Sequence, residues 1–104
     1  MRLSEAEQSA ISVAARQVLP AGSRVALFGS RTDETRRGGD IDLLVEPPMH
    51  LTPQVSDDMC ARFAARLYRL LGERRIDIVV ARGVADDRLI ITEARRQAIE
   101  LVHT

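Results

Sequence analysis

Three aspartates are the residues of this chain whose type and spacing most directly suggest chemistry. Asp40 and Asp42 stand one residue apart at the head of an apolar run. In a strand, alternate side chains share one face, so the two carboxylates would lie about 6–7 Å apart on the same side. Such a pair repels unless a cation lies between the carboxylates, and Mg²⁺ prefers oxygen ligands of this kind. Asp77 interrupts another apolar segment and would complete a triad if its strand lies beside that of Asp42.

Gly29 and Ser30 close a short apolar run upstream of this pair and could form an anion site. A glycine lets the backbone approach a ligand closely. A helix that begins at Ser30 would point its free N–H groups and its positive dipole end at a phosphate. The stretch therefore combines an anion cradle with metal-binding carboxylates, which metal-assisted phosphoryl or nucleotidyl transfer requires.

Each of these residues also has an ordinary structural interpretation. An Asp-x-Asp pair at a strand start is more often a pair of loop carboxylates than a metal site. A buried carboxylate at Asp77 would carry a large desolvation cost unless it is paired or binds a metal. A salt bridge to Arg74 or Arg75 would serve equally well. The functional interpretation therefore depends on the combination of residues.

Composition limits the class of protein. The chain has 104 residues, so we expect one domain over residues 1–104. Its 15 basic and 15 acidic residues balance, which argues against a general nucleic-acid-binding domain. All basic residues are Arg, and the absence of Lys excludes a P-loop. No apolar run reaches about 18 residues, so we expect a soluble, cytoplasmic protein with no membrane contact.

Periodicity and turn residues predict the elements that would position these side chains. Capping and apolar spacing indicate a helix beginning after Ser4, a polar helix near 30–36, and a helix from Thr52 to Gly72. Apolar runs bounded by turn residues indicate strands at 24–28, 41–46 and 75–81, and a last helix is expected over 86–102. The order α-β-α-β-α-β-α predicts a small α/β (α+β) domain with helices packed on a mixed three-stranded sheet.

The motif resembles that of the minimal nucleotidyltransferases (MNT) of the DNA polymerase β-like superfamily. That pattern is Gly-Ser, a spacer, Asp-x-Asp and a third Asp on a following strand. Here Gly29-Ser30, the spacer 31–39, Asp40-Ile41-Asp42 and the later Asp77 match it, and the element order matches too. The spacer is short, and Gly39 stands where the family often has Ser. Neither departure affects a proposed metal ligand.

The resemblance implies a role for each matching residue. Ser30 and the backbone near Gly29 would hold the β- and γ-phosphates of ATP, and Arg31 could reach the triphosphate. Asp40 and Asp42 would bind two Mg²⁺ ions. Asp77 would share one ion and help to deprotonate the attacking hydroxyl. The reaction would be attack of a hydroxyl on the α-phosphate of ATP, with pyrophosphate leaving.

The partner is also implied by resemblance. Stand-alone domains of this family resemble the antitoxin halves of HEPN/MNT toxin–antitoxin modules, in which the nucleotidyltransferase attaches AMP to a tyrosine of a HEPN ribonuclease toxin. The leading interpretation is therefore a type VII-like antitoxin that forms a hetero-oligomer with its toxin.

Two alternatives belong to other classes. One is an antitoxin that neutralises its toxin by stoichiometric binding without catalysis, although occlusion alone would not need three carboxylates around a phosphate cradle. The other is a small-molecule (antibiotic) nucleotidyltransferase, which would need an acidic acceptor pocket that this short chain could supply only as a dimer.

Overall fold

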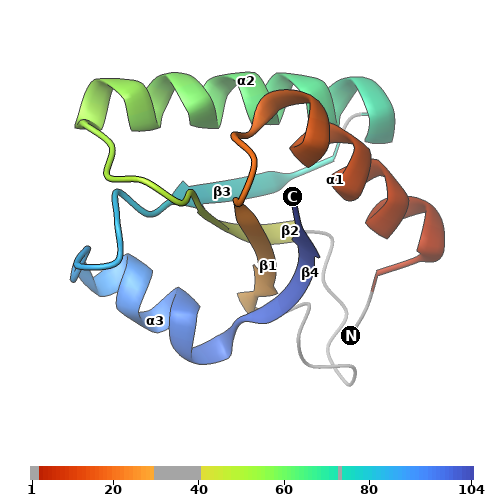
Figure 1. The fold of residues 1–104 in the computed structure, drawn as a ribbon. Coiled ribbons are helices and arrows are strands. Elements are labelled where there is room, and N and C mark those ends of the chain that lie inside the picture. The colour runs from red at the N-terminus through yellow and green to blue at the C-terminus, as the bar shows by residue number, and fades with distance from the viewer. Residues whose placement is uncertain (1–2, 30–40, 73) are drawn as a thin grey trace.

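A computed structural model describes residues 3–29, 41–72 and 74–104. Three helices and four strands are present in these residues, in the order α1-β1-β2-α2-β3-α3-β4 (Figure 1). Their bounds are α1 Glu5–Val18, β1 Arg24–Phe28, β2 Ile41–Glu46, α2 Pro53–Leu71, β3 Ile76–Val80, α3 Leu89–Gln97 and β4 Ile99–His103. The helix predicted near 30–36 lies outside the described residues. None of the described helices is long and apolar enough to cross a membrane.

The ends of the first two helices follow from local sequence signals. Ser4 caps α1 through a capping box, in which its Oγ accepts from the Glu7 N–H at 3.0 Å and Glu7 Oε1 accepts from the Ser4 N–H at 2.9 Å. Thr52 caps α2, and its Oγ1 accepts from the Val55 N–H at 3.3 Å. Gly72 ends α2 with a φ of 78°, a conformation that favours glycine. These predictions are confirmed.

The strands form one mixed sheet in the order β3-β2-β1-β4. β1 is antiparallel to both β2 and β4, and β2 is parallel to β3. The registers place Phe28, Asp42 and Asp77 side by side across β1, β2 and β3. The predicted α/β fold class, with helices packed on a mixed sheet, is therefore confirmed, with one strand more than predicted.

The additional strand corrects the prediction of a last helix over 86–102. Helix α3 ends at Gln97, and β4 pairs with β1 through partners such as Leu27 and Ile99. Apolar spacing at Ala98 and Val102 had suggested that the helix continues. Pairing with β1 instead satisfies backbone N–H and C=O groups along both strands, and Ile99 and Val102 are β-branched residues that fit a sheet. A long-range partner thus overrode the local helical pattern.

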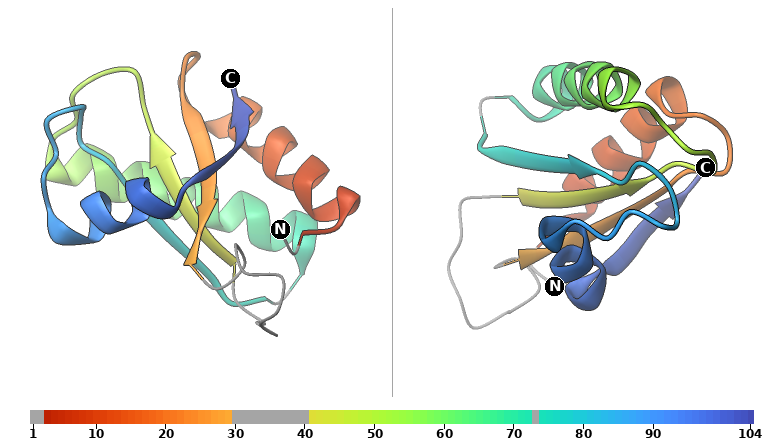
Figure 2. Two further views of the ribbon diagram at one scale, coloured as in Figure 1. Left: turned by 90° about the horizontal axis from the view of Figure 1, so that it is seen from below. Right: turned by 90° about the vertical axis from the view of Figure 1, so that its left-hand side faces the viewer.

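The two faces of the sheet are covered differently. Helices α1 and α2 lie together on one face and α3 lies on the other (Figure 2). Strand residues alternate between the two faces. Ile41 and Leu43 belong to the main core with α1 and α2, whereas Leu44 packs with Ile91 and Ala94 of α3. Asp42 therefore points to the α3 face.

The connection from β3 to α3 is held by one carboxylate. Asp86 accepts from the backbone N–H groups of Arg82 at 2.9 Å and Arg88 at 3.2 Å, and from Arg88 Nη2 at 2.8 Å. Arg88 Nη2 also donates to the Val80 carbonyl at 3.0 Å. The Asp86 side chain is 4% exposed. The Arg88 guanidinium holds the pKa of Asp86 well below its ordinary value.

We predict that Asp86→Asn destabilises the protein in a pH-dependent way. Because the folded-state pKa is lowered, the carboxylate stabilises the fold fully above the unfolded pKa of about 4, and this contribution is lost as the pH falls further. Asp86→Asn should lower Tm by about 5 °C at pH 7. The difference should shrink at pH 3, as measured by thermal unfolding. Asp87→Asn, at an exposed position, is the control, and an equal Tm loss for Asp86→Asn at both pH values would contradict the assignment.

Candidate active site

The carboxylates of Asp42 and Asp77 lie on neighbouring strands at the same level of the sheet. The two residues are register partners in the parallel pair β2 and β3, so their Cα atoms are about 4.8 Å apart. Both side chains point to the α3 face, because Asp42 alternates with the core residues of β2 and Asp77 with those of β3. The two carboxylates therefore lie on the same face of neighbouring strands.

Gly29 completes this end of the sheet from β1. It follows Phe28, the register partner of Asp42, and has a φ of +76°. A Cβ built on Gly29 would lie 2.3 Å from Oδ2 and 3.0 Å from Cγ of Asp42. The space that a side chain would fill is therefore taken by the Asp42 carboxylate, and only glycine allows this approach. The glycine of the predicted anion cradle is thus in direct contact with a predicted metal ligand.

Gln97 is a residue of this region that the sequence motif did not include. Its Oε1 accepts from the Gly29 N–H at 3.0 Å, so the last residue of α3 contacts the turn after β1. Gln97 lies inside the last helix predicted from the sequence, 86–102, and belongs to no recognisable pattern, so no sequence signal could have found it. The Gly29 N–H is therefore engaged by a side chain of the protein.

Asp77 has surroundings different from those considered in the sequence. Its side chain is exposed, so a large desolvation cost does not apply. Among the residues that the structure describes, Asp77 makes no hydrogen bond or ion pair. Arg74, one of its two suggested partners, instead pairs with the buried Glu7 of α1. This pair ties the turn that precedes β3 to the start of α1.

Three predicted site residues lie in the segment 30–40, outside the described residues: Ser30, Arg31 and Asp40. Among the described residues, no group of three or more His, Cys, Asp or Glu side chains could hold a metal. The two carboxylates that are described fit a hard cation, because both offer oxygen ligands from one face of the sheet. The predicted third carboxylate, Asp40, immediately precedes β2 in the chain.

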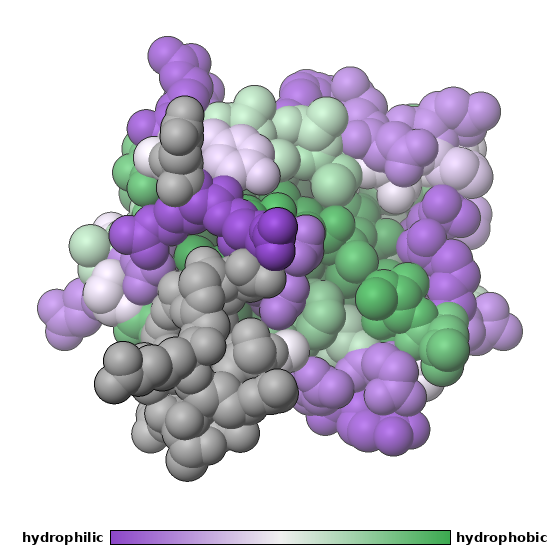
Figure 3. Space-filling view, turned by 180° about the vertical axis from the view of Figure 1, so that it is seen from behind, coloured by the Kyte–Doolittle hydropathy of each residue, from purple (hydrophilic) through white to green (hydrophobic). Residues whose placement is uncertain are grey.

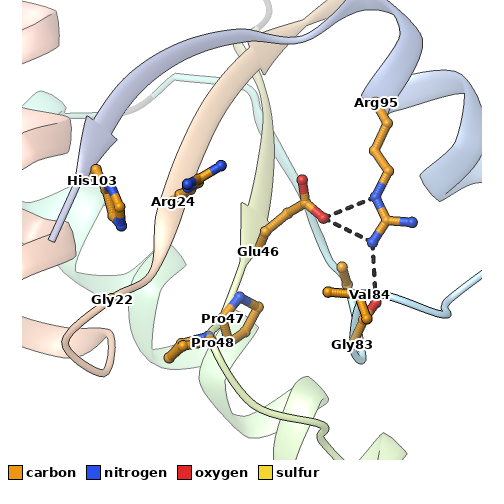
Figure 4. A pocket seen from close by; sticks show the side chains of 10 residues that line it. Gly22, Arg24, Glu46, Pro47, Pro48, Gly83, Val84, Arg95 and His103 are labelled. Atoms are coloured by element: carbon orange, nitrogen blue, oxygen red, sulfur yellow. Dashed lines mark hydrogen bonds and ion pairs between the residues drawn. The ribbon is translucent and has the colours of Figure 1, made fainter.

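A hollow of about 550 Å³ lies at the other end of the same strands. Arg95 of α3 spans it, with its Nε 2.8 Å from Glu46 Oε1 and its Nη2 3.0 Å from the Gly83 carbonyl oxygen (Figure 4). Glu46 is the last residue of β2, whereas Asp42 is near the first. The guanidinium is thus used to hold α3 on the sheet, and the hollow is separate from the aspartates.

Solved toxin–antitoxin structures contain chains similar to this one. A toxin–antitoxin with AMP-PNP has a chain with 21% identity and a TM-score of 0.63, and the match covers 93% of this chain and 73% of that chain. A chain of the toxin–antitoxin MntA–HepT has 19% identity and a TM-score of 0.62, over 97% of this chain and 74% of that chain. The tri-AMPylated Shewanella oneidensis HEPN toxin in complex with MNT antitoxin gives 20% identity and a TM-score of 0.60, over 94% and 71%.

No protein-family model and no curated protein matches the chain. At about 20% identity, the structural likeness establishes the fold. The chain therefore has the fold of the matching chains in these toxin–antitoxin structures.

We predict that Gly29→Ala is much more destabilising than Gly72→Ala. Both glycines have similar positive φ values, 76° and 78°, but a Cβ at Gly72 would meet no atom within 4 Å. Gly72→Ala should therefore cost about 1 kcal/mol of backbone strain. Gly29→Ala should cost about 1–3 kcal/mol more, because its Cβ displaces the Asp42 carboxylate.

Urea unfolding of the two variants measures this difference in the free energy of unfolding. The double variant Gly29→Ala, Asp42→Ala should recover the steric part of the loss. Equal costs at the two glycines would show that the Asp42 carboxylate does not approach Gly29 as closely as described.

Proposed function

We propose that this protein is a Mg²⁺-dependent nucleotidyltransferase that acts as an antitoxin by transferring AMP from ATP to a tyrosine hydroxyl of a cognate HEPN toxin. One observation carries the proposal. Gly29, Asp42 and Asp77 lie at one end of the sheet, and the two aspartates are on the face on which α3 packs. An anion-binding turn in contact with a carboxylate pair is the arrangement needed for chemistry on a metal-bound triphosphate.

Some of the chain's residues would bind the triphosphate and others would bind the metal ions. Ser30 and the backbone after Gly29 would hold the β- and γ-phosphates, with Arg31 reaching the same group. Asp40, Asp42 and Asp77 would hold two Mg²⁺ ions. When bound, these ions supply charge neutralisation for the phosphates and the leaving group.

Asp77 would accept the proton of the attacking hydroxyl. It is suited to this role because it is exposed and makes no ion pair within the described part of the chain. The hydroxyl oxygen forms a bond to the α-phosphorus of ATP as the bond to pyrophosphate breaks. The products are an AMP ester on the acceptor and free pyrophosphate.

An exposed apolar surface supports a protein acceptor. The molecule seen from the side opposite to that of Figure 1 has apolar side chains across the middle of the face (Figure 3). On α3, the Leu89 side chain is 75% exposed and that of Ile90 is 49% exposed. Apolar residues exposed in this way are typical of interaction sites. Leu89 and Ile90 are in the first turn of α3, and Gln97, the last residue of the helix, contacts Gly29, so a partner that covers the whole helix would reach the carboxylate end of the sheet.

The comparisons support the same partner and substrate. Structures that share the fold are of toxin–antitoxin complexes, one with AMP-PNP and one with a tri-AMPylated HEPN toxin. We therefore expect ATP as the nucleotide, a HEPN toxin as the acceptor, and a hetero-oligomer as the working assembly.

The test is transfer of AMP to the product of the neighbouring gene, followed by intact mass spectrometry with ATP and Mg²⁺. The wild-type chain should add AMP to the partner. Asp42→Asn should reduce the transfer rate at least about a hundredfold while the fold is retained, because a metal ligand is lost. Asp58→Asn is the matched control, since Asp58 is exposed on α2 and, within the described part of the chain, pairs with Arg62 one turn away.

The outcomes separate the alternatives. Transfer at the wild-type rate by Asp42→Asn would contradict the metal assignment. A tight complex that silences the partner without any mass gain would favour an antitoxin that acts by binding alone. Pyrophosphate release that depends on a small molecule, with a dimeric chain, would favour an antibiotic nucleotidyltransferase.

A further inference from the structure

The side chain of Gln97 is held in a defined place beside the candidate site. Helix α3 is anchored to the sheet by the buried Ile91 and Ala94. Strand β4 begins two residues after Gln97 and pairs at once with β1, where Ile99 is the partner of Leu27. The backbone of Gln97 is therefore fixed from both sides, and little conformational freedom remains to be lost when its side chain binds.

The hydrogen bond to Gly29 fixes which way the amide faces. A backbone N–H can donate only to an acceptor, so the Gln97 oxygen must be the atom at 3.0 Å. The amide NH₂ group, with its two N–H donors, is then turned away from the Gly29 nitrogen. Among the described residues this NH₂ group has no hydrogen-bond partner, and the Gln97 residue is exposed.

Two donors are thus presented at the edge of the turn that approaches Asp42. The group bound there under the proposed function is a triphosphate, which carries acceptor oxygens and no donors at neutral pH. A neutral amide is well suited to this place, because it donates to phosphate without competing with a cation for the carboxylates. Because Gln97 occupies the Gly29 N–H, its own NH₂ group adds two donors beside Gly29.

We propose that Gln97 is a positioning residue for the Gly29 turn and that its amide N–H groups donate to a phosphate oxygen of the bound nucleotide. This inference rests on the proposed function, since it assigns a further nucleotide contact to the same site. The amide oxygen of Gln97 holds the Gly29 turn against Asp42, and the amide nitrogen binds the nucleotide.

The two tasks are separated by two substitutions. Gln97→Glu keeps an oxygen that accepts from Gly29, so the turn and the thermal stability should be retained, but a carboxylate replaces the NH₂ group and repels phosphate. Gln97→Leu removes both functions. Binding of AMP-PNP with Mg²⁺ is measured by calorimetry, and Tm of the free protein is measured alongside.

We expect AMP-PNP to bind at least about tenfold more weakly to Gln97→Glu, at nearly unchanged Tm, because a hydrogen bond to a charged group is lost and a like charge is added. Gln97→Leu should weaken binding about tenfold and also lower Tm. Arg96→Leu is the control, because Arg96 is next to Gln97 in the chain and its side chain is 71% exposed. Its Nη2 lies 3.7 Å from Glu93 Oε1. This control should keep most of the nucleotide affinity.

Unchanged AMP-PNP affinity in Gln97→Glu would overturn the donor role. A loss of Tm without a loss of affinity in Gln97→Leu would show that the residue is structural only. If the wild-type chain itself binds no AMP-PNP, the proposed function fails and this inference fails with it. A wild-type chain that binds, with variants that bind equally well, overturns the inference alone.

Discussion

The close approach of the Gly29 backbone to the Asp42 carboxylate is the constraint on which the rest of the site depends. It exists because β1 and β2 pair antiparallel with Phe28 opposite Asp42. Gly29, the residue after β1, therefore lies directly against that carboxylate. A side chain at this position would collide with Asp42, and the positive φ of the turn would be strained for other residues. A single backbone position thus meets two demands, one steric and one conformational.

The division of the sheet into two faces makes this arrangement compatible with stability. The face under α1 and α2 holds the main apolar core, to which every second residue of β1, β2 and β3 contributes. The residues between them point to the other face, where α3 packs on a much smaller cluster around Leu44. Polar and charged side chains can occupy the end of this second face because the core does not need them. The parallel crossover through α2 then places Asp77 in register with Asp42.

The C-terminal part of the chain connects the opposite ends of the sheet. At one end, Arg95 joins α3 to Glu46 of β2 and to the loop before α3, which Asp86 and Arg88 organise. At the other end, Gln97 joins α3 to the Gly29 turn. Both contacts come from the last turn of α3, and β4 continues directly from this helix along β1. A segment without a recognised motif thereby takes part in positioning the candidate site.

Local signals in the sequence determined much of this structure. The caps at Ser4, Thr52 and Gly72, and the strands at 24–28 and 41–46, depend on neighbouring residues and on alternation, and both are visible in one dimension. The spacing of the glycine–serine pair and the aspartates likewise led to the chemistry that we propose. These features could be predicted because the forces that produce them act over a few residues.

Tertiary structure decided what depends on distant partners. Strand β4 forms because β1 offers an edge, although residues 98–102 have helical apolar spacing. The exposure of Asp77 follows from its place on the α3 face of an edge strand, and the role of Gln97 from a hydrogen bond between residues far apart in the chain. Backbone groups must be satisfied wherever they are buried or paired, and the identity of the partner is set by packing of the whole chain. The sequence alone therefore indicated candidate residues for the proposed chemistry, and the fold decided which other residues lie beside them.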